Sequence, residues 1–156
     1  QNNFKLPKVE GRGSIHNLLF KKFKIKLIDQ SYNANPETMI ESIENFSIIK
    51  NNNKNKILIL GNMNELGLSS IKYHIQIIRV IEKNYFDHVI LSGDSFKKAL
   101  NMFSNLKNKY VYLNQSKSIM RYLEKNIHKN AIIMAKCSNK TGVNYFVKKL
   151  KLFKKG

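Results

Sequence analysis

The sequence is poor in cysteine and has no long apolar run, and both absences restrict the class of protein. Cys137 is the single cysteine among 156 residues, which excludes an internal disulfide framework and a cysteine-rich metal site. No apolar run approaches the roughly 20 residues that span a membrane, and the first residues lack the pattern of a secretory signal. We therefore expect a cytoplasmic globular protein, long enough for one domain with a sizeable core.

Acidic residues are also scarce. Ten Asp and Glu residues stand against 28 Lys and Arg residues, giving a net charge of +18 and a pI near 10.0. This surplus favours association with polyanions. However, arginine, the preferred bidentate reader of bases and phosphates, occurs only at Arg12, Arg79 and Arg121. The lysines are scattered and no nucleic-acid motif is present, so we expect no specific nucleic-acid partner. A stand-alone basic polyanion-binding module remains an alternative function.

Apolar periodicity predicts strand–helix units that repeat along the chain. Continuous apolar runs at residues 56–60, 87–91 and 131–135 are typical of strands buried on both faces. An antiparallel hairpin is expected at residues 14–20 and 23–28, and a further strand at residues 109–113. Ser69 or Ser70 can cap one of the helices. The predicted helices cover residues 36–49, 70–81, 96–103, 116–127 and 142–153.

This pattern predicts an α/β fold: a three-layer, Rossmann-like, mostly parallel sheet with an antiparallel edge hairpin. Residues 1–10 are expected to be a linker from an upstream domain, and residues 11–156 the domain itself. The loops that follow the parallel strands should gather along one rim, where such folds bind ligands. The sequence lacks both the Gly-x-Gly-x-x-Gly fingerprint and the phosphate loop ending in Gly-Lys-Ser/Thr. Dinucleotide binding is therefore unsupported.

The loop at residues 29–36 is the strongest site candidate. Its sequence is Asp-Gln-Ser-Tyr-Asn-Ala-Asn-Pro, and it joins a predicted strand to a predicted helix. Asn35 followed by Pro36 is typical of a helix start, and the free N–H groups at a helix start favour an anion. An ordinary polar loop is the alternative interpretation.

Together with other loops, this stretch resembles the carboxyl-terminal domain of the Mur ligases, in particular those that add D-alanyl-D-alanine. Residues 61–67, Gly-Asn-Met-Asn-Glu-Leu-Gly, are similar to a Gly-Asp-Met-x-Glu-Leu-Gly motif of that family, and His74 falls where the family has a histidine. Gly11-Arg12 and Lys136-Cys137-Ser138 match weaker motifs. The resemblance covers roughly residues 10–150.

The resemblance implies one domain of an ATP-dependent amide ligase of peptidoglycan synthesis. Such an enzyme joins D-alanyl-D-alanine to UDP-MurNAc-tripeptide through an acyl phosphate. ATP and Mg²⁺ would be bound mainly by the central domain, so no catalytic or metal-binding residue is expected in this chain. The domain would act as a lid on upstream domains of the same chain and would be inactive alone. The same domain of a sister Mur ligase is an alternative.

The expected site residues fall into two groups. Contacts to the nucleotide are expected from Arg12, Asp29, Tyr32, Asn33 and Asn35, and contacts to the substrate from Lys136 and Ser138. Simpler roles remain open, including a surface ion pair for Arg12, a loop cap for Asp29, rim packing for Tyr32 and a solvated Lys136. For Asn35 the helix cap is the favoured role, and His74 is expected to be packed rather than to act as a base.

Four positions depart from the family pattern. Gln30 stands where many members have an acidic residue, and Asn62 replaces an aspartate. Cys137 and Asn139 replace a glycine and an arginine. A lost glycine matters where the backbone needs positive φ or a close approach, so we expect these changes to affect ligand contacts rather than the fold.

Overall fold

The computed structural model describes residues 11–156 and shows an α/β domain with one six-stranded sheet. The linker predicted at residues 1–10 lies outside the described residues. The strands are β1 (Ser14–Phe20), β2 (Phe23–Gln30), β3 (Asn55–Leu60), β4 (His88–Leu91), β5 (Val111–Tyr112) and β6 (Ala131–Lys136). The helices are α1 (Pro36–Ser47), α2 (Ser70–Glu82), α3 (Asp94–Leu100), α4 (Ser116–Asn126) and α5 (Gly142–Leu150), with a 3₁₀ turn, η1 (Gly67–Ser69), before α2.

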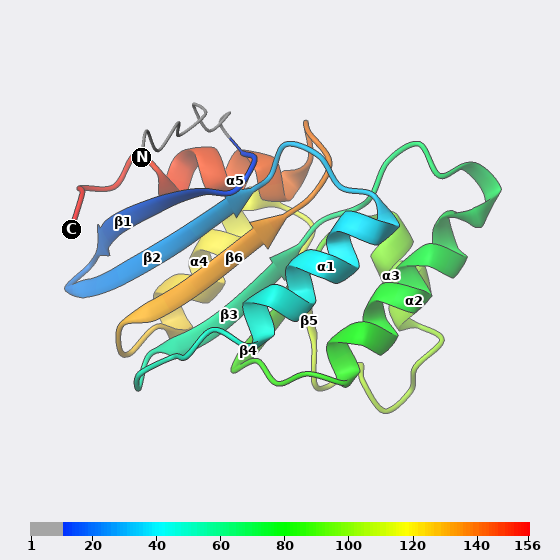
Figure 1. Cartoon of the computed structure of the whole chain (residues 1–156), viewed down its shortest axis with the longest axis horizontal. Coiled ribbons are helices and arrows are strands. Elements are labelled where there is room, and N and C mark those ends of the chain that lie inside the picture. The colour runs from blue at the N-terminus through cyan, green and yellow to red at the C-terminus, as the bar shows by residue number, and fades with distance from the viewer. Residues whose placement is uncertain (1–10) are drawn as a thin grey trace, which may run out of the picture.

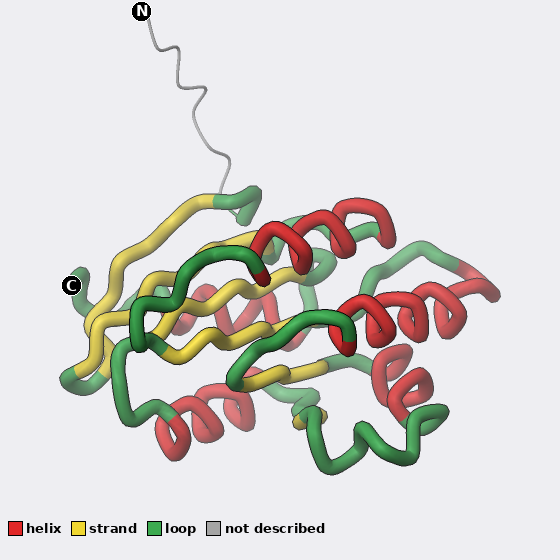
Figure 2. Tube along the Cα trace, turned by 60° about the horizontal axis from the view of Figure 1, so that its bottom comes forward, coloured by secondary structure: helices red, strands yellow, loops and turns green. Residues whose placement is uncertain are grey.

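The sheet has the strand order β1-β2-β6-β3-β4-β5, and its pairs are parallel except for β1 with β2. Figure 1 shows α1 and α2 in front of the sheet and α4 and α5 behind it. Figure 2 shows helices on both sides of the strands from a second direction. The predicted three-layer fold with an antiparallel edge hairpin is therefore confirmed.

Alternating side chains of the central strands build two separate cores. In β3, Leu58 and Leu60 pack in the core under α1, α2 and α3, whereas Ile57 and Ile59 pack in the core under α4 and α5. All four side chains are buried, as expected for a strand covered on both faces. Each such side chain contributes about 1.5–3 kcal/mol when fully buried. Together, these contacts hold the carboxyl ends of the strands in one row.

The edge strand β1 is partly covered by the last residues of the chain. The Leu19 N–H donates to the Lys154 carbonyl at 2.7 Å, and the Gly156 N–H donates to the Asn17 carbonyl at 3.1 Å. In Figure 1 the carboxyl terminus lies next to β1. The pairing satisfies backbone groups that an exposed edge would offer to another chain.

The structure corrects several local expectations. The helix α1 ends at Ser47 and not at residue 49, and α3 spans Asp94–Leu100 rather than residues 96–103. The strand predicted at residues 109–113 is only Val111–Tyr112, because at the sheet edge it has one neighbour, the short β4. The last helix ends at Leu150, not at residue 153. The 3₁₀ turn precedes α2, and Ser69 makes no side-chain cap hydrogen bond. Ser70 Oγ instead lies 2.8 Å from Ser95 Oγ.

Candidate functional site

The loops after β2, β3 and β6 meet at one rim of the sheet, as the sequence predicts. Because β6 lies between β2 and β3, its loop contacts both neighbours. The Ser138 N–H donates to the Asn62 carbonyl at 3.1 Å, and the Asn64 N–H donates to Ser138 Oγ at 2.8 Å. Lys136 Nζ reaches the other way, to the Asn33 carbonyl. The Ser138 hydroxyl thus holds the loop at residues 61–67, and its expected substrate contact stays a prediction.

The amino end of α1 faces this rim and is capped by Asn35. The Asn35 side chain accepts from the Thr38 N–H at 2.9 Å, and Pro36 occupies the first turn. The predicted cap is therefore confirmed. A nucleotide contact by the same side chain stays a prediction, and the cap already satisfies one of the free N–H groups at the helix start.

Lys136 places a nearly buried cation beside the first of two cavities. Its Nζ donates to Gln30 Oε1 and to the Asn33 carbonyl, both at 3.2 Å, and only 6% of the residue is exposed. Burial lowers the pKa of Lys136 from 10.5, although nearby Cys137 and Glu41 oppose this. The cavity has a volume of about 390 Å³ and is also lined by Arg12. The hydrogen-bond acceptors of Lys136 Nζ are neutral oxygens, so an anion in the cavity can interact with this cation. The Glu41 carboxylate lines the same cavity, so such an anion would also lie near one negative side chain.

A second cavity, of about 240 Å³, lies on the α5 side of the loop after β2. Asp29, Tyr32, Lys148 and Lys151 are among its lining residues. The Arg12 guanidinium lies over the Tyr32 ring, 4.4 Å from the centroid, a cation–π contact. Arg12 lines the first cavity and Tyr32 the second, so this pair stands between them. Asn35 and Ser138 are absent from the lining residues described for both cavities.

Gly11 is required beside this arginine–tyrosine pair. Its φ is +76°, and a Cβ on it would lie 2.9 Å from the Tyr32 Cβ. The Tyr32 N–H donates to the Gly11 carbonyl at 3.2 Å. A larger residue at position 11 would therefore push the segment around Gly11 away from the loop that carries Tyr32.

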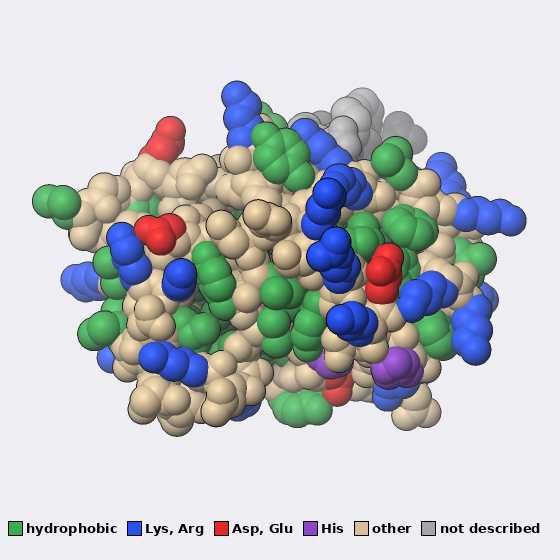
Figure 3. Space-filling model, turned by 180° about the vertical axis from the view of Figure 1, so that it is seen from behind, with side chains coloured by type: hydrophobic (Ala, Val, Ile, Leu, Met, Phe, Trp, Pro, Cys, Tyr) green, Lys and Arg blue, Asp and Glu red, His purple; other side chains and the backbone are tan. Residues whose placement is uncertain are grey.

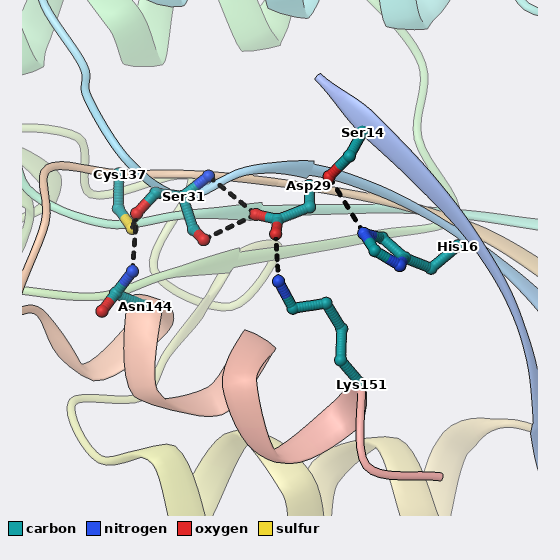
Figure 4. Close-up of polar contacts among 7 residues, drawn as sticks. All are labelled: Ser14, His16, Asp29, Ser31, Cys137, Asn144 and Lys151. Atoms are coloured by element: carbon teal, nitrogen blue, oxygen red, sulfur yellow. Dashed lines mark hydrogen bonds and ion pairs between the residues drawn. The ribbon is translucent and has the colours of Figure 1, made fainter. Parts of the chain in front are cut away.

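Asp29 is buried and fully engaged within the protein (Figure 4). Its Oδ1 accepts from the Ser31 N–H at 3.0 Å and from Ser31 Oγ at 2.6 Å, and its Oδ2 accepts from Lys151 Nζ at 2.8 Å. Burial acts to raise the pKa of Asp29, but the hydrogen bonds from Lys151 and Ser31 outweigh it and keep the pKa below 3.8. The direct nucleotide contact expected for Asp29 stays a prediction.

His74 is a packed side chain, as predicted. Its Nε2 accepts from the Met63 N–H at 3.1 Å, so Nδ1 carries the proton and donates to the Ser70 carbonyl at 2.6 Å. The ring is buried and packs edge-on against Phe96. Burial lowers the pKa of His74, and the neutral ring anchors the loop at residues 61–67.

The departures from the family pattern are accommodated locally. Cys137 sits against Gly61, where a Cβ would lie 2.7 Å from the Cys137 Cβ, so the bulkier residue is tolerated because position 61 is glycine. Burial raises the pKa of the Cys137 thiol to about 12, which keeps it protonated and unreactive. Gln30 supplies a neutral oxygen to Lys136 in place of a carboxylate.

Several residues around the two cavities were not singled out from the sequence. Thr38, Glu41, Ser42 and Asn45 line the first cavity from α1, and their spacing of three or four residues is a polar stripe that the sequence displays. Lys151 has no such signal, because nothing distinguishes it among so many lysines. Among residues 11–156, no group of three or more His, Cys, Asp or Glu residues is placed to hold a metal ion. Likewise, the helices described are too short or too polar to cross a membrane.

The fold and the rim define a class: a three-layer α/β domain whose cationic loop cavities suit anionic ligands. Residues 19–139 match the family model described as "Mur ligase, glutamate ligase domain". The chain therefore belongs to the Mur ligase family.

Individual relatives agree with this assignment. The chain is 32% identical over 127 residues to the UDP-N-acetylmuramoyl-tripeptide–D-alanyl-D-alanine ligase of Buchnera aphidicola subsp. Acyrthosiphon pisum (strain APS). The match covers 80% of this chain and 26% of that protein, so the chain spans about a quarter of the length of this relative.

Solved structures show the same fold. The MurF ligase of Thermotoga maritima in complex with ADP superposes with a TM-score of 0.71 at 23% identity, covering 94% of this chain and 31% of that one. MurF from Acinetobacter baumannii superposes with a TM-score of 0.72 at 20% identity, covering 92% and 30%.

Proposed function

We propose that this chain is the carboxyl-terminal domain of an ATP-dependent ligase that adds D-alanyl-D-alanine to UDP-MurNAc-tripeptide in peptidoglycan synthesis. The family membership supports a ligase domain, and the curated relative carries this activity in its name. The structural observation that carries the proposal is Lys136, a nearly buried cation beside a polar cavity at the carboxyl ends of parallel strands. Such a cation suits a carboxylate or a phosphate.

The reaction needs two transfers. ATP would give its γ-phosphoryl group to the terminal carboxylate of the tripeptide, leaving ADP and an acyl phosphate. The amine of the dipeptide would then attack the acyl carbon, lose a proton and expel phosphate as the amide bond forms. Catalysis of this kind depends on positioning and on stabilisation of negative charge. We assign no catalytic residue to this chain.

Different residues at the rim would contact different parts of the ligands. Lys136 would hold an anionic group in the first cavity. Arg12, Tyr32 and Asn33 would face the nucleotide, with Asp29 and Asn35 shaping the loop between them. We assign Mg²⁺ and most ATP contacts to upstream domains, as the resemblance to the family implies. This domain would close on them as a lid, in the cytoplasm.

The test is a ligase assay on the full-length protein. Phosphate release is followed with ATP, Mg²⁺ and UDP-MurNAc-tripeptide, with and without D-alanyl-D-alanine. Wild type is compared with Lys136→Met, which removes the charge, and with Lys140→Met, which removes an exposed charge from the same loop. We expect dipeptide-dependent turnover in wild type and Lys140→Met, and a loss of about 10–100-fold in kcat/KM in Lys136→Met, as for a buried charge-assisted hydrogen bond.

The outcomes separate the alternatives. Turnover with a single amino acid and a shorter UDP-MurNAc acceptor, in place of the dipeptide and the tripeptide, would identify a sister Mur ligase. An equal loss in both lysine variants would mean that overall charge, not Lys136, matters. Absence of turnover in wild type would refute the ligase proposal.

A stand-alone polyanion-binding module is the second candidate, favoured by the net charge of +18. It requires no ATP and no dipeptide, and it predicts binding that depends on charge density alone. The absence of a nucleic-acid motif, together with the buried position of Lys136, argues for the ligase domain instead.

A further inference from the structure

We propose that Lys151 is a positioning residue, which acts through Asp29 to set the conformation of the loop after β2. The consequence for nucleotide binding rests on the proposed function. The conformational role does not, and the two are tested separately below.

The first observation is the ion pair between Lys151 and Asp29. Lys151 directly follows α5 and reaches back to the end of β2, where its Nζ lies 2.8 Å from Asp29 Oδ2. The Lys151 side chain is 13% exposed and the Asp29 side chain 0%. A carboxylate so deeply buried needs a counter-charge, and removing one partner of such a pair leaves an uncompensated charge.

The second observation is that the same carboxylate holds Ser31. Both the N–H and the hydroxyl of Ser31 donate to Asp29 Oδ1. The carbonyl of Ser31 accepts from Asn144 Nδ2 at 2.7 Å, so α5 also holds this residue by a hydrogen bond (Figure 4). The loop is therefore tied at one residue to the end of β2 and to α5.

The third observation concerns the two residues directly after Ser31. Tyr32 stacks under the Arg12 guanidinium, and its N–H donates to the Gly11 carbonyl. Asn33 presents its carbonyl to Lys136 Nζ. The position of Ser31 therefore sets where these two residues, which we expect to face the nucleotide, are placed.

The consequence of losing Lys151 follows from charge. Without the ammonium group, Asp29 must either take up a proton or turn toward water. A proton removes the negative charge that strengthens both bonds from Ser31, and rotation breaks them. The loop would then sample other conformations while the two cores, which do not involve Lys151, stay packed.

The first experiment measures amide hydrogen exchange in the 156-residue chain. Lys151→Met is compared with Lys151→Arg, which keeps the charge, and with Lys149→Met, which removes an exposed charge two residues earlier, in the last turn of α5. We expect exchange at Ser31 and Tyr32 to rise about tenfold or more in Lys151→Met only. Amides of β3 serve as the internal reference and should be unchanged.

The second experiment measures ATP kinetics in the full-length protein with the same variants. We expect Lys151→Met to raise the KM for ATP several-fold with kcat largely kept, because the loop is misplaced but the chemistry lies elsewhere. Lys151→Arg should restore most of the affinity, and Lys149→Met should match wild type.

Each possible result supports or overturns the proposed role of Lys151. Unchanged exchange at Ser31 and Tyr32 overturns the inference whatever the enzyme does. An equal rise at β3 also overturns it, since Lys151 would then support global stability only. Faster exchange at Ser31 and Tyr32 with an unchanged KM for ATP would overturn the link between Lys151 and nucleotide binding. If wild type has no ligase activity, the proposed function fails. The hydrogen-exchange data still test whether Lys151 sets the conformation of the loop after β2.

Discussion

At the scale of single residues, Lys136 shows a conflict between binding and stability. Only 6% of Lys136 is exposed, and its Nζ donates to two neutral oxygens at 3.2 Å, with Glu41 as a nearby carboxylate. Burial lowers its pKa, so folding disfavours the protonated form that an anionic ligand needs. Burial of this kind occurs in structural contacts too: Lys56 is equally buried, and its Nζ donates to the Ser47 carbonyl away from both cavities. The position of Lys136 beside a cavity at the rim is therefore what suggests binding.

The first prediction follows from this conflict. Lys136→Met should raise the free energy of unfolding by about 1 kcal/mol, because a buried charge is replaced by an apolar side chain of similar length. For a domain of this size that corresponds to a rise of about 2–4 °C in Tm, measured by calorimetry near pH 7. Lys140→Met is the control and should leave Tm unchanged. A fall in Tm for Lys136→Met would show that the lysine stabilises the fold.

At the scale of elements, the rim is assembled by contacts between loops and helices rather than by the strands alone. His74 of α2 holds the loop at residues 61–67 through the Met63 N–H. Asn62 of that loop reaches the start of α3, where its Oδ1 lies 3.4 Å from the Phe96 nitrogen. The neutral histidine is therefore a support for a neighbouring loop, and its protonation would remove the acceptor for Met63.

The second prediction is a pH dependence of stability. Burial keeps the pKa of His74 below 6.5 in the folded state, so the unfolded state takes up its proton first as pH falls. Stability should therefore decrease as pH drops below about 6.5. Chemical denaturation between pH 7.5 and 5.5 should show this slope in wild type and a smaller slope in His74→Gln.

A matched control and a residual effect complete this test. His128→Gln changes an exposed histidine and should keep the wild-type slope. Part of the slope should remain in His74→Gln, because burial also lowers the pKa of His88. Identical slopes in wild type and His74→Gln would contradict the support role.

At the scale of the whole molecule, charge is distributed unevenly. Figure 3 shows the face opposite to that of Figure 1, where lysine and arginine side chains gather mainly toward one side. Exposed cations on α4 and α5 include Lys117, Arg121, Lys125, Lys148 and Lys149. In contrast, α1 carries three glutamates. A positive surface of this kind attracts polyanions without reading their sequence.

The third prediction concerns this surface. Binding to heparin or polyphosphate should weaken steeply with salt, and the double variant Lys125→Glu/Lys149→Glu should reduce the slope of log K against log[salt] by about 2 or more. The control, Lys72→Glu/Lys83→Glu on α2 and the residue after it, has the same change in net charge. Equal effects in both variants would show that net charge, not this face, controls the binding.

Local patterns were sufficient to predict most of the fold. The apolar runs of β3, β4 and β6 and the helical spacing between them are set by neighbours in sequence, and burial on both faces requires such runs. The Asn35 cap was equally local. The length of β5 could not be predicted from local sequence, because it depends on how much of β4 is available for pairing at the sheet edge.

Some residues of the candidate site were predictable from the sequence, and others were not. Arg12, Tyr32, Asn33 and Lys136 could be chosen from motifs, because family loops keep their residue order. Their partners could not: Lys151 meets Asp29 across 122 residues, and no pattern marks that lysine among the others. Only the packing of α5 against the sheet brings the two charges together, since a long-range ion pair is determined by where the elements lie and not by their local sequence.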